Sequence, residues 1–411
     1  MAVQTFKGSF AFPDSSANLS ITGVGFQPDV VIFWTTRQAA TGFADDKALH
    51  VGWAVSSSAQ GGVAFFADDN VAVGTSNGSD ISNLFCVKAV TCAASSVSTT
   101  LDASFVSMDP DGFTIDPVNV SVGALFIVHY FCIGGLDNAF AGRFSIPTTA
   151  ISQAYTGVGF QPDCLLVLSN LFGTGNRSDV GHKLTIGAAS SVADQAYLYI
   201  GGSNAIPTAL ASVQSTGAIM RTLNFAGTDN TTGALQSFDA DGFTINYSVV
   251  PGTTRDFFAL ALKGANFKVA TDTQKTSTGT QAKTGIGFQP KGLLLFGTNR
   301  ASSASVNSTL ASLSIGASDG THEGTSWVGG AEVNPTEEDT ATLTDKVFVH
   351  ATAPATTDAD ADLSSFDSDG YTLNWSTADA TAREFIGLSI GQGVSTTPPF
   401  RPAMTSRGTS W

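Results

Sequence analysis

The sequence predicts an all-β protein of three tandem homologous β-sandwich units, jelly-roll-like in type, followed by an extended C-terminal arm. Three observations predict this class. Two short motifs recur three times in constant order, apolar residues alternate at a period of two, and no long stretch has the spacing of an amphipathic helix. The copies lie about 130 residues apart, which matches one ordinary domain rather than a solenoid repeat. We therefore place the units at residues 1–135, 136–264 and 265–393, and the arm at residues 394–411.

The first motif, here called the GFQP motif, reads Gly-Val-Gly-Phe-Gln-Pro-Asp in its first two copies and Gly-Ile-Gly-Phe-Gln-Pro-Lys in its third. The second, the DxDG motif, reads Asp-x-Asp-Gly followed by Phe-Thr-Ile or Tyr-Thr-Leu. The copies of the GFQP motif are Gly23–Asp29, Gly157–Asp163 and Gly285–Lys291, and those of the DxDG motif are Asp109–Ile115, Asp239–Ile245 and Asp367–Leu373. Because order and separation hold in every copy, the repeat is a whole folding unit.

Each GFQP motif leads into a short, continuous apolar run, which predicts a central strand buried on both faces. Shorter alternating segments at turn spacing follow, and each copy ends in another strongly apolar strand. The runs after the motif are 29–34, 164–168 and 293–296, and the closing strands are 124–133, 257–262 and 385–390. The segment 335–345 is the one place where the pattern allows a short helix.

Both motifs have a structural interpretation. In the GFQP motif, glycine permits a turn into the buried strand and proline begins that strand where no amide donor is needed. The DxDG motif predicts a hairpin turn, with Asp capping the backbone and Gly in the left-handed region. A weak cation site is the alternative, since carboxylates attract hard cations, but the third acidic residue and closing Glu of an EF-hand are missing. Its candidates are Asp109, Asp111, Asp239, Asp241, Asp367 and Asp369.

Composition narrows the class of function. Only 13% of residues are charged and the net charge is −15, which disfavours a nucleic-acid partner. No basic start precedes an apolar run and no apolar segment reaches about 20 residues, so we expect neither a secretory signal nor membrane insertion. The four cysteines, Cys86, Cys92, Cys132 and Cys164, do not recur between copies, which favours free buried thiols over a disulfide framework.

Catalytic patterns are weak, so the sequence predicts no enzyme and no cofactor. Gly316-Ala-Ser318-Asp-Gly320 fits the nucleophile-elbow pattern, but a turn and another strand are expected after it rather than a helix. The five histidines occupy no common position and form no metal-binding pair, and His129 is expected to be a hydrogen-bonded core residue. Paired carboxylates of a glycosidase remain open at Asp45, Asp46, Asp68 and Asp69, although solvated turns account for them.

A basic residue precedes the second aspartate of each DxDG motif by 20–23 positions, within an otherwise apolar stretch. These residues are Lys88, Arg221 and Lys346. A base in such a place can pair with one of the turn carboxylates, with its aliphatic stem covering apolar surface. A base that faces a ligand is the alternative.

The two motifs together resemble the GFQPD-type lectin-like repeat domains of tailed-bacteriophage structural and tail-fibre proteins. The resemblance covers about residues 4–392 and rests on Gly25–Asp29, Gly159–Asp163 and Gly287–Lys291, with Asp109–Thr114, Phe238–Thr244 and Phe366–Thr372 downstream. The third copy departs by carrying Lys291, and a Trp-Ile-Lys continuation is absent. The resemblance implies a concanavalin-like jelly roll on a virion, a domain type that serves as a structural unit and in some cases binds glycans.

The function that we expect is therefore that of a non-enzymatic virion structural protein of a tailed bacteriophage, assembled in the host cytoplasm. It would be an accessory or decoration piece, or a neck or tail-fibre-like component, with other virion proteins as partners and a homo-oligomer left open. The alternative is a glycan-binding adhesin of the tail, with Trp53, Trp327 and Trp375 as candidates for stacking on sugar rings of the host surface. A polysaccharide depolymerase is the third possibility.

The arm from residue 394 onward is rich in proline and has no apolar period. A free segment of this composition should lack a core of its own. We expect it to lie on a neighbouring subunit or partner protein, with Phe400 and Trp411 as apolar anchors and Arg401 and Arg407 facing acidic surface.

Overall fold

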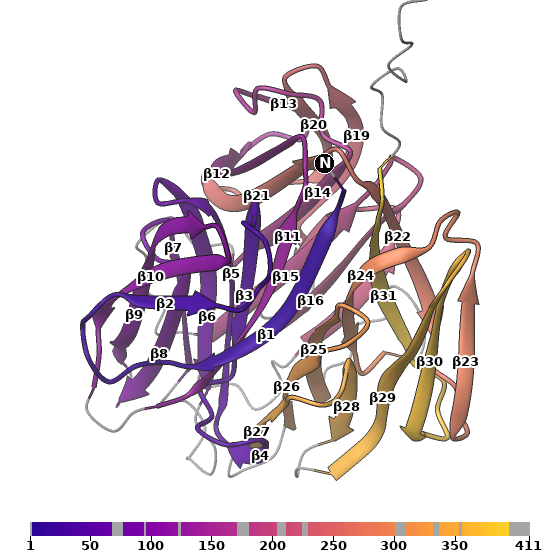
Figure 1. Cartoon of the computed structure of the whole chain (residues 1–411). Coiled ribbons are helices and arrows are strands. Elements are labelled where there is room, and N and C mark those ends of the chain that lie inside the picture. The colour runs from indigo at the N-terminus through magenta and orange to yellow at the C-terminus, as the bar shows by residue number, and fades with distance from the viewer. Residues whose placement is uncertain are drawn as a thin grey trace, which may run out of the picture.

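The structure is a computed structural model, and it describes residues 2–67, 77–93, 96–121, 125–170, 181–203, 211–223, 229–300, 310–331, 337–352 and 356–393. Within these ranges the regular secondary structure consists of β-strands alone, and the strands pair in antiparallel sheets (Figure 1). This confirms the all-β class. The expected short helix at 335–345 is wrong. From Glu337 to Leu343 the chain is instead a strand, because its edge pairs with two neighbouring strands.

The chain forms three units, each built from one large and one small sheet with the same strand order. In unit 1 the large sheet runs β1 (Gln4–Ala11), β11 (Ile127–Gly134), β3 (Val30–Thr35), β5 (Lys47–Ser56), β6 (Ala59–Ala67), β7 (Asn77–Ser82). Its small sheet runs β2 (Leu19–Thr22), β10 (Gly112–Asn119), β9 (Ser96–Asp109), β8 (Val87–Ala93).

Unit 2 repeats this order. Its large sheet runs β12 (Asn138–Ile146), β21 (Arg255–Lys263), β14 (Cys164–Ser169), β15 (Gly181–Ala189), β16 (Gln195–Ser203), β17 (Ala211–Thr216), and its small sheet runs β13 (Ser152–Thr156), β20 (Gly242–Val249), β19 (Asp229–Asp239), β18 (Met220–Leu223). The expected boundaries at residues 135 and 264 lie in the turns before β12 and after β21.

Unit 3 repeats it again, with one addition. Its large sheet runs β22 (Asn266–Thr273), β31 (Glu384–Gly391), β24 (Pro290–Thr298), β25 (Leu310–Ser318), β26 (Glu323–Ala331), β27 (Glu337–Leu343), and then β4 (Gly42–Asp45), which unit 1 contributes. Its small sheet runs β23 (Gly279–Thr284), β30 (Gly370–Thr377), β29 (Thr356–Asp367), β28 (Phe348–Thr352). The added strand ties unit 1 to unit 3 through backbone pairing from Gly42↔Thr342 to Asp45↔Asp339.

The central strands of the large sheets are buried on both faces, which explains the continuous apolar runs. One face of each large sheet packs on its own small sheet, in three separate hydrophobic clusters. The other face contributes to a single cluster that all three units share. Along β3, for example, Val31 and Phe33 enter the cluster of unit 1, whereas Ile32 and Trp34 enter the shared one. The predicted burial of these strands on both faces is confirmed.

The three units close into a ring around this shared core (Figure 1). Strands β6 and β7 of unit 1 contact β12 and β15 of unit 2, β16 and β17 of unit 2 contact β22, β24 and β25 of unit 3, and β26 and β27 of unit 3 contact β1 and β5 of unit 1. Corresponding strands make each junction, so the arrangement follows a pseudo-threefold, head-to-tail closure within one chain. The small sheets lie outside, and strands such as β23 expose alternate residues.

Candidate functional site

The two repeated motifs meet in space and form one clasp in each unit. In unit 1, the carboxylate of Asp111 accepts hydrogen bonds from the amides of Gly23 (3.0 Å) and Gly25 (2.6 Å), and the Gln27 side chain donates to the Met108 carbonyl (2.8 Å). Units 2 and 3 repeat these contacts through Asp241 and Asp369. The backbone amides lower the pKa of Asp111 and Asp241 below the usual value.

The clasp differs from the predicted turn in what the aspartates cap. Asp111 caps the GFQP loop rather than its own hairpin. The first aspartate of the motif, Asp109, instead accepts hydrogen bonds from the hydroxyls of Ser107 (2.7 Å) and Thr114 (2.6 Å). Asp239 and Asp367 have the equivalent hydroxyl partners. The amides and hydroxyls account for both oxygens of each of the six candidate carboxylates, which favours a structural role over cation binding.

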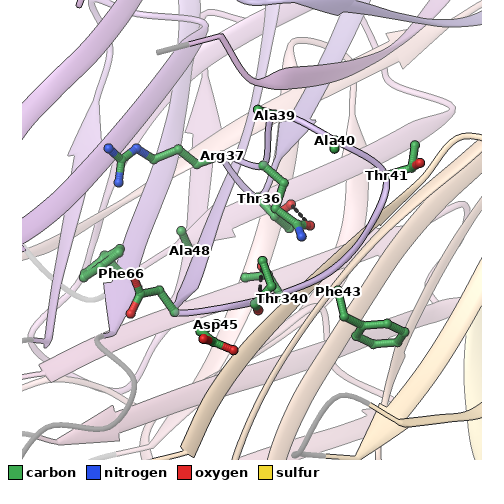
Figure 2. Close-up of a pocket in the computed structure, with 13 residues that line it drawn as sticks. Thr36, Arg37, Ala39, Ala40, Thr41, Phe43, Asp45, Ala48, Phe66 and Thr340 are labelled. Carbon is green, nitrogen blue, oxygen red and sulfur yellow. Dashed lines mark hydrogen bonds between the residues drawn. The ribbon is translucent and has the colours of Figure 1, made fainter. Parts of the chain in front are cut away.

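A separate open pocket of about 330 Å³ lies where unit 1 reaches unit 3 (Figure 2). The segment from Thr36 to Asp46 forms most of its wall, Ala48 and Phe66 come from β5 and β6, and Thr340 comes from β27. The wall is fixed to unit 3 at several points. Thr36 and Thr342 share a short hydroxyl hydrogen bond, and the Phe43 ring packs edge-on against Trp327 with centroids 6.1 Å apart.

The pocket has a charged and strained rim. Arg37 and Asp46 are the described non-glycine residues with positive φ, at 65° and 70°. Burial lowers the pKa of Arg37, and the charge of Asp46 partly offsets that effect. Backbone strain of this kind persists only where surrounding contacts hold it, and it recurs at binding sites. The lining offers a guanidinium, two carboxylates (Asp45 and Asp46), amide and hydroxyl groups and two aromatic rings, but no histidine, cysteine, serine or lysine.

That set of groups suits binding rather than catalysis. Arginine and carboxylates supply donors and acceptors for polar ligands, and the half-buried Phe43 supplies apolar surface. Among the described residues that line the pocket, no nucleophile has an adjacent base. Of the four aspartates considered as a glycosidase carboxylate pair, Asp45 and Asp46 lie on this rim, whereas Asp68 and Asp69 fall outside the described residues.

The tryptophans expected to stack on sugar rings cannot do so. Trp53, Trp327 and Trp375 are each 1% exposed, because they fill the sheet interiors. They were candidates by residue type alone, and their strands β5, β26 and β30 turn them inward. Arg37 was not a candidate from the sequence and carried no pattern that could have identified it.

Other sequence candidates are structural. Lys88, Arg221 and Lys346 pair with carboxylates as expected, but with Asp80, Asp229 and Asp362 on neighbouring strands rather than with the turn aspartates. Cys86, Cys132 and Cys164 are free and buried, and burial raises the pKa of each thiol. The side chain of Cys92 is outside the described part. His129 is a hydrogen-bonded core residue, as predicted, with Lys7 Nζ 3.1 Å from its Nδ1.

The nucleophile-elbow pattern at Ser318 is not an elbow. Ser318 ends strand β25, is buried, and accepts a hydrogen bond from the Gly320 amide at 3.1 Å, and strand β26 follows the turn. The docking candidates Phe400, Arg401, Arg407 and Trp411 lie outside the described residues. Their role stays a prediction.

No protein-family model matches the chain, and a search of curated proteins finds no sequence similar to it. In the described part of the chain, no helix has the length and apolar character needed to cross a membrane.

Proposed function

We propose that the chain is a non-enzymatic structural protein of a tailed-bacteriophage virion, an accessory or decoration piece on the capsid, neck or tail. One observation carries the proposal: a single chain closes three like units into a ring around one shared core. Closed head-to-tail assembly normally requires several identical subunits. A chain that builds the closure by itself is a rigid body with nearly threefold shape, suited to a symmetric position on a particle.

The proposal is tested in two steps. Light scattering after gel filtration should give one chain of 42.2 kDa, because the ring is already closed. Particles purified from the phage that encodes the chain should then contain it in a fixed copy number, measured by mass spectrometry and located by imaging a labelled copy. Its absence from washed particles would contradict the proposal.

The arm enters the same proposal as the docking element. Removing residues 394–411 should leave the melting transition unchanged and abolish incorporation into particles, since short segments with aromatic anchors carry much of the binding energy of such contacts. Normal incorporation of the truncated chain would show that another surface docks.

Glycan binding is the second candidate function, and the Arg37–Asp46 pocket favours it. Its charged rim, with the half-buried Phe43 beside it, offers groups that hold a polar ligand without transforming it. A glycan array should give signals that Arg37→Ala and Asp45→Ala abolish, while Asp14→Ala, at an exposed position outside the pocket lining, keeps them. Signals that survive both pocket variants would place any glycan elsewhere.

A further inference from the structure

Three potential metal ligands gather in the small sheet of unit 3. His350 lies on β28, Asp358 on β29, and Asp379 in the turn between β30 and β31. One ligand atom from each lies within 4.8 Å of the other two. Among the described residues, this is the one set of three or more histidine, cysteine, aspartate or glutamate side chains that meets this condition.

A β-bulge brings the first two together. Along the β28–β29 pair, His350 lies opposite Ala359 and Ala351 lies opposite Thr357, so Asp358 is an extra residue without a partner. Bulges of this kind redirect a side chain. Here the Asp358 Oδ2 comes to 3.7 Å from His350 Nε2, which is too long for a hydrogen bond.

The bulge recurs in all three units, but only in unit 3 are the bulge positions occupied by side chains that can bind a metal, a histidine and an aspartate. The same register shift occurs between Thr222 and Leu223 in unit 2 and between Ala89 and Val90 in unit 1. The residues that correspond to His350 and Asp358 are Thr222 and Asn230 in unit 2, and Ala89 and Thr100 in unit 1. The histidine and aspartate are therefore additions to a shared backbone feature that does not itself require them.

The buried atoms of this group lack partners. His350 is 2% exposed, and both its Nε2 and the Asp358 Oδ2 are buried without a hydrogen bond. Such atoms are costly unless something satisfies them. Burial, and to a smaller degree the nearby charge of Arg383, lowers the pKa of His350 to about 3, so the imidazole is neutral at pH 7 and carries a lone pair. A charged histidine therefore does not compensate Asp358.

The charges around the group favour a cation. Burial raises the pKa of Asp358, and repulsion from Asp379 raises it further. Arg383 is a positive side chain against the set, but its Nε donates to Asp379 Oδ2 (2.7 Å) and its guanidinium donates to the Asn299 carbonyl (2.5 Å). Arg383 thus holds Asp379 in place without satisfying the His350–Asp358 pair.

We propose that His350, Asp358 and Asp379 bind one divalent transition-metal ion, of which Zn²⁺ and Mn²⁺ are the fitting examples. An imidazole with two carboxylates suits these ions better than Ca²⁺ or Mg²⁺, which prefer oxygen ligands alone. Zinc at about 2.1 Å from its ligands places them about 3.4 Å apart, so the 3.7 Å separation needs only a small adjustment. Three protein ligands leave a position for water.

Supporting hydrogen bonds already orient the two carboxylates. The Thr381 amide donates to Asp379 Oδ1 at 2.8 Å, and the Thr352 hydroxyl donates to Asp358 Oδ1 at 3.5 Å. Contacts of this kind fix ligand geometry in metal sites. The ion would join the bulge of β29 to the β30–β31 turn, and it would do so in unit 3 alone. The site does not depend on the virion proposal.

The test is a Zn²⁺ titration of the full-length chain after chelator treatment and dialysis, by calorimetry, with Co²⁺ absorption as a spectroscopic readout. We expect one ion per chain, a higher melting temperature with Zn²⁺, and little response to Ca²⁺. His350→Ala and Asp358→Asn should each lower the Zn²⁺ affinity at least about 100-fold. Asp379 lies outside the core, so Asp379→Asn should fold and lower the Zn²⁺ affinity in the same way, which keeps the test valid if either buried variant fails to fold.

Two matched controls make the result specific. His322→Ala removes another histidine–aspartate contact, between His322 Nδ1 and Asp319 Oδ2 at 2.9 Å, which is exposed and has no third ligand among the described residues. Asp362→Asn removes a carboxylate from the same strand as Asp358, one that pairs with Lys346. Both should bind one Zn²⁺ normally. The proposal is overturned if Zn²⁺ does not bind at millimolar concentration, or if Asp379→Asn and His350→Ala bind it as the unaltered chain does.

Discussion

The three clasps are nearly identical, whereas the three junctions between units all differ. In each clasp the two glycine amides lie 3.0–3.1 Å and 2.6 Å from the same aspartate, and the glutamine donates over 2.7–2.9 Å. At the junctions, the equivalent positions on the first strand of each unit are Lys7, Ala141 and Val269. The three copies thus share the same contacts within each unit, where the clasp stabilises the unit's own fold. They differ at the junctions, where each unit must pack against one particular neighbour.

The junction contacts show how the order is specified. The Lys7 amide donates to Asp319 Oδ2 across the junction of units 3 and 1, and the Val269 amide donates to Ser190 Oγ across that of units 2 and 3, both at 2.9 Å. At the junction of units 1 and 2, Phe65 instead stacks on His182 with centroids 5.1 Å apart. These unlike contacts at the three junctions disfavour exchange of one unit for another, because a unit in the wrong place would lose the contacts of its own junction.

The largest expected effect is in the clasp, at a glycine of the DxDG turn. Gly242 has φ 137°, and a Cβ there would lie 2.0 Å from the Tyr155 carbonyl oxygen. Gly242→Ala should destabilise the protein by about 3 kcal/mol or more, since it adds backbone strain to a clash with backbone. Chemical denaturation measures this. Gly252→Ala, with open space around its Cβ, is the control and should be close to neutral. Equal losses of unfolding free energy at Gly242 and Gly252 would show that the DxDG turn has room for a side chain.

The next effect is at a junction, and it is a gain. Lys7 is buried, with its Nζ near His129 Nδ1 and 2.7 Å from the Glu323 carbonyl, and burial lowers its pKa to about 7. Lys7→Met should stabilise the chain at pH 7 by about 1–4 kcal/mol, because it removes a desolvated amine. Lys268→Met at the neighbouring junction, where the ion pair with Asp194 is partly exposed, should cost at most about 1 kcal/mol.

The pH dependence separates the causes. Between pH 7 and 10.5 the unfolded chain binds a proton that native Lys7 has released, so the stability of the unaltered protein should rise with pH across this window. Lys7→Met should remove that rise, and its advantage should shrink towards pH 10.5. Glu323, whose pKa burial raises to about 7, acts in the opposite sense between pH 4.5 and 7 and is present in both proteins. A destabilised Lys7→Met protein would show that the amine's hydrogen bonds outweigh its desolvation.

Much of the fold followed from the sequence because its signals are local. The apolar runs after each GFQP motif predicted β3, β14 and β24 and their burial on both faces, although not the reason, which is the core shared between units. The clasp joins residues 82–88 positions apart, so no local pattern contained it, although the constant pairing of the two motifs was a signal of contact.

The candidate sites were harder to predict. The pocket depends on β4 leaving its own unit for the edge of β27, a choice that no period in the sequence encodes. The His350–Asp358 pair depends on a bulge, which shifts the register by one residue and defeats spacing rules. The prediction that Trp53, Trp327 and Trp375 stack on sugar rings was wrong, because an aromatic residue is equally suited to a hydrophobic core and to a ligand site.

A smaller effect tests whether the clasps are equivalent. Gln27→Ala, Gln161→Ala and Gln289→Ala each remove one side-chain hydrogen bond to the carbonyl before the DxDG turn. Each should cost about 0.5–1.5 kcal/mol, and the three values should agree within error, because the surroundings match. Thermal unfolding of the three variants measures this. A spread as wide as that between junction variants would remove the distinction between clasp and junction.

The smallest effect concerns the clasp carboxylates, which are exposed. The Gly157 and Gly159 amides hold the pKa of Asp241 below the usual 3.8, so its stabilising contribution is present above that value and is lost as the pH falls through the lower native one. The asparagine of Asp241→Asn offers one acceptor oxygen, whereas both oxygens of Asp241 accept hydrogen bonds. The melting temperature of the variant should therefore be slightly lower than that of the unaltered protein at pH 7, and this difference should vanish in acid. The same holds for Asp111→Asn. Millimolar calcium should change neither, since amides already occupy these oxygens. A calcium-dependent rise in the melting temperature that the substitutions abolish would instead restore the cation-site interpretation of the DxDG motif.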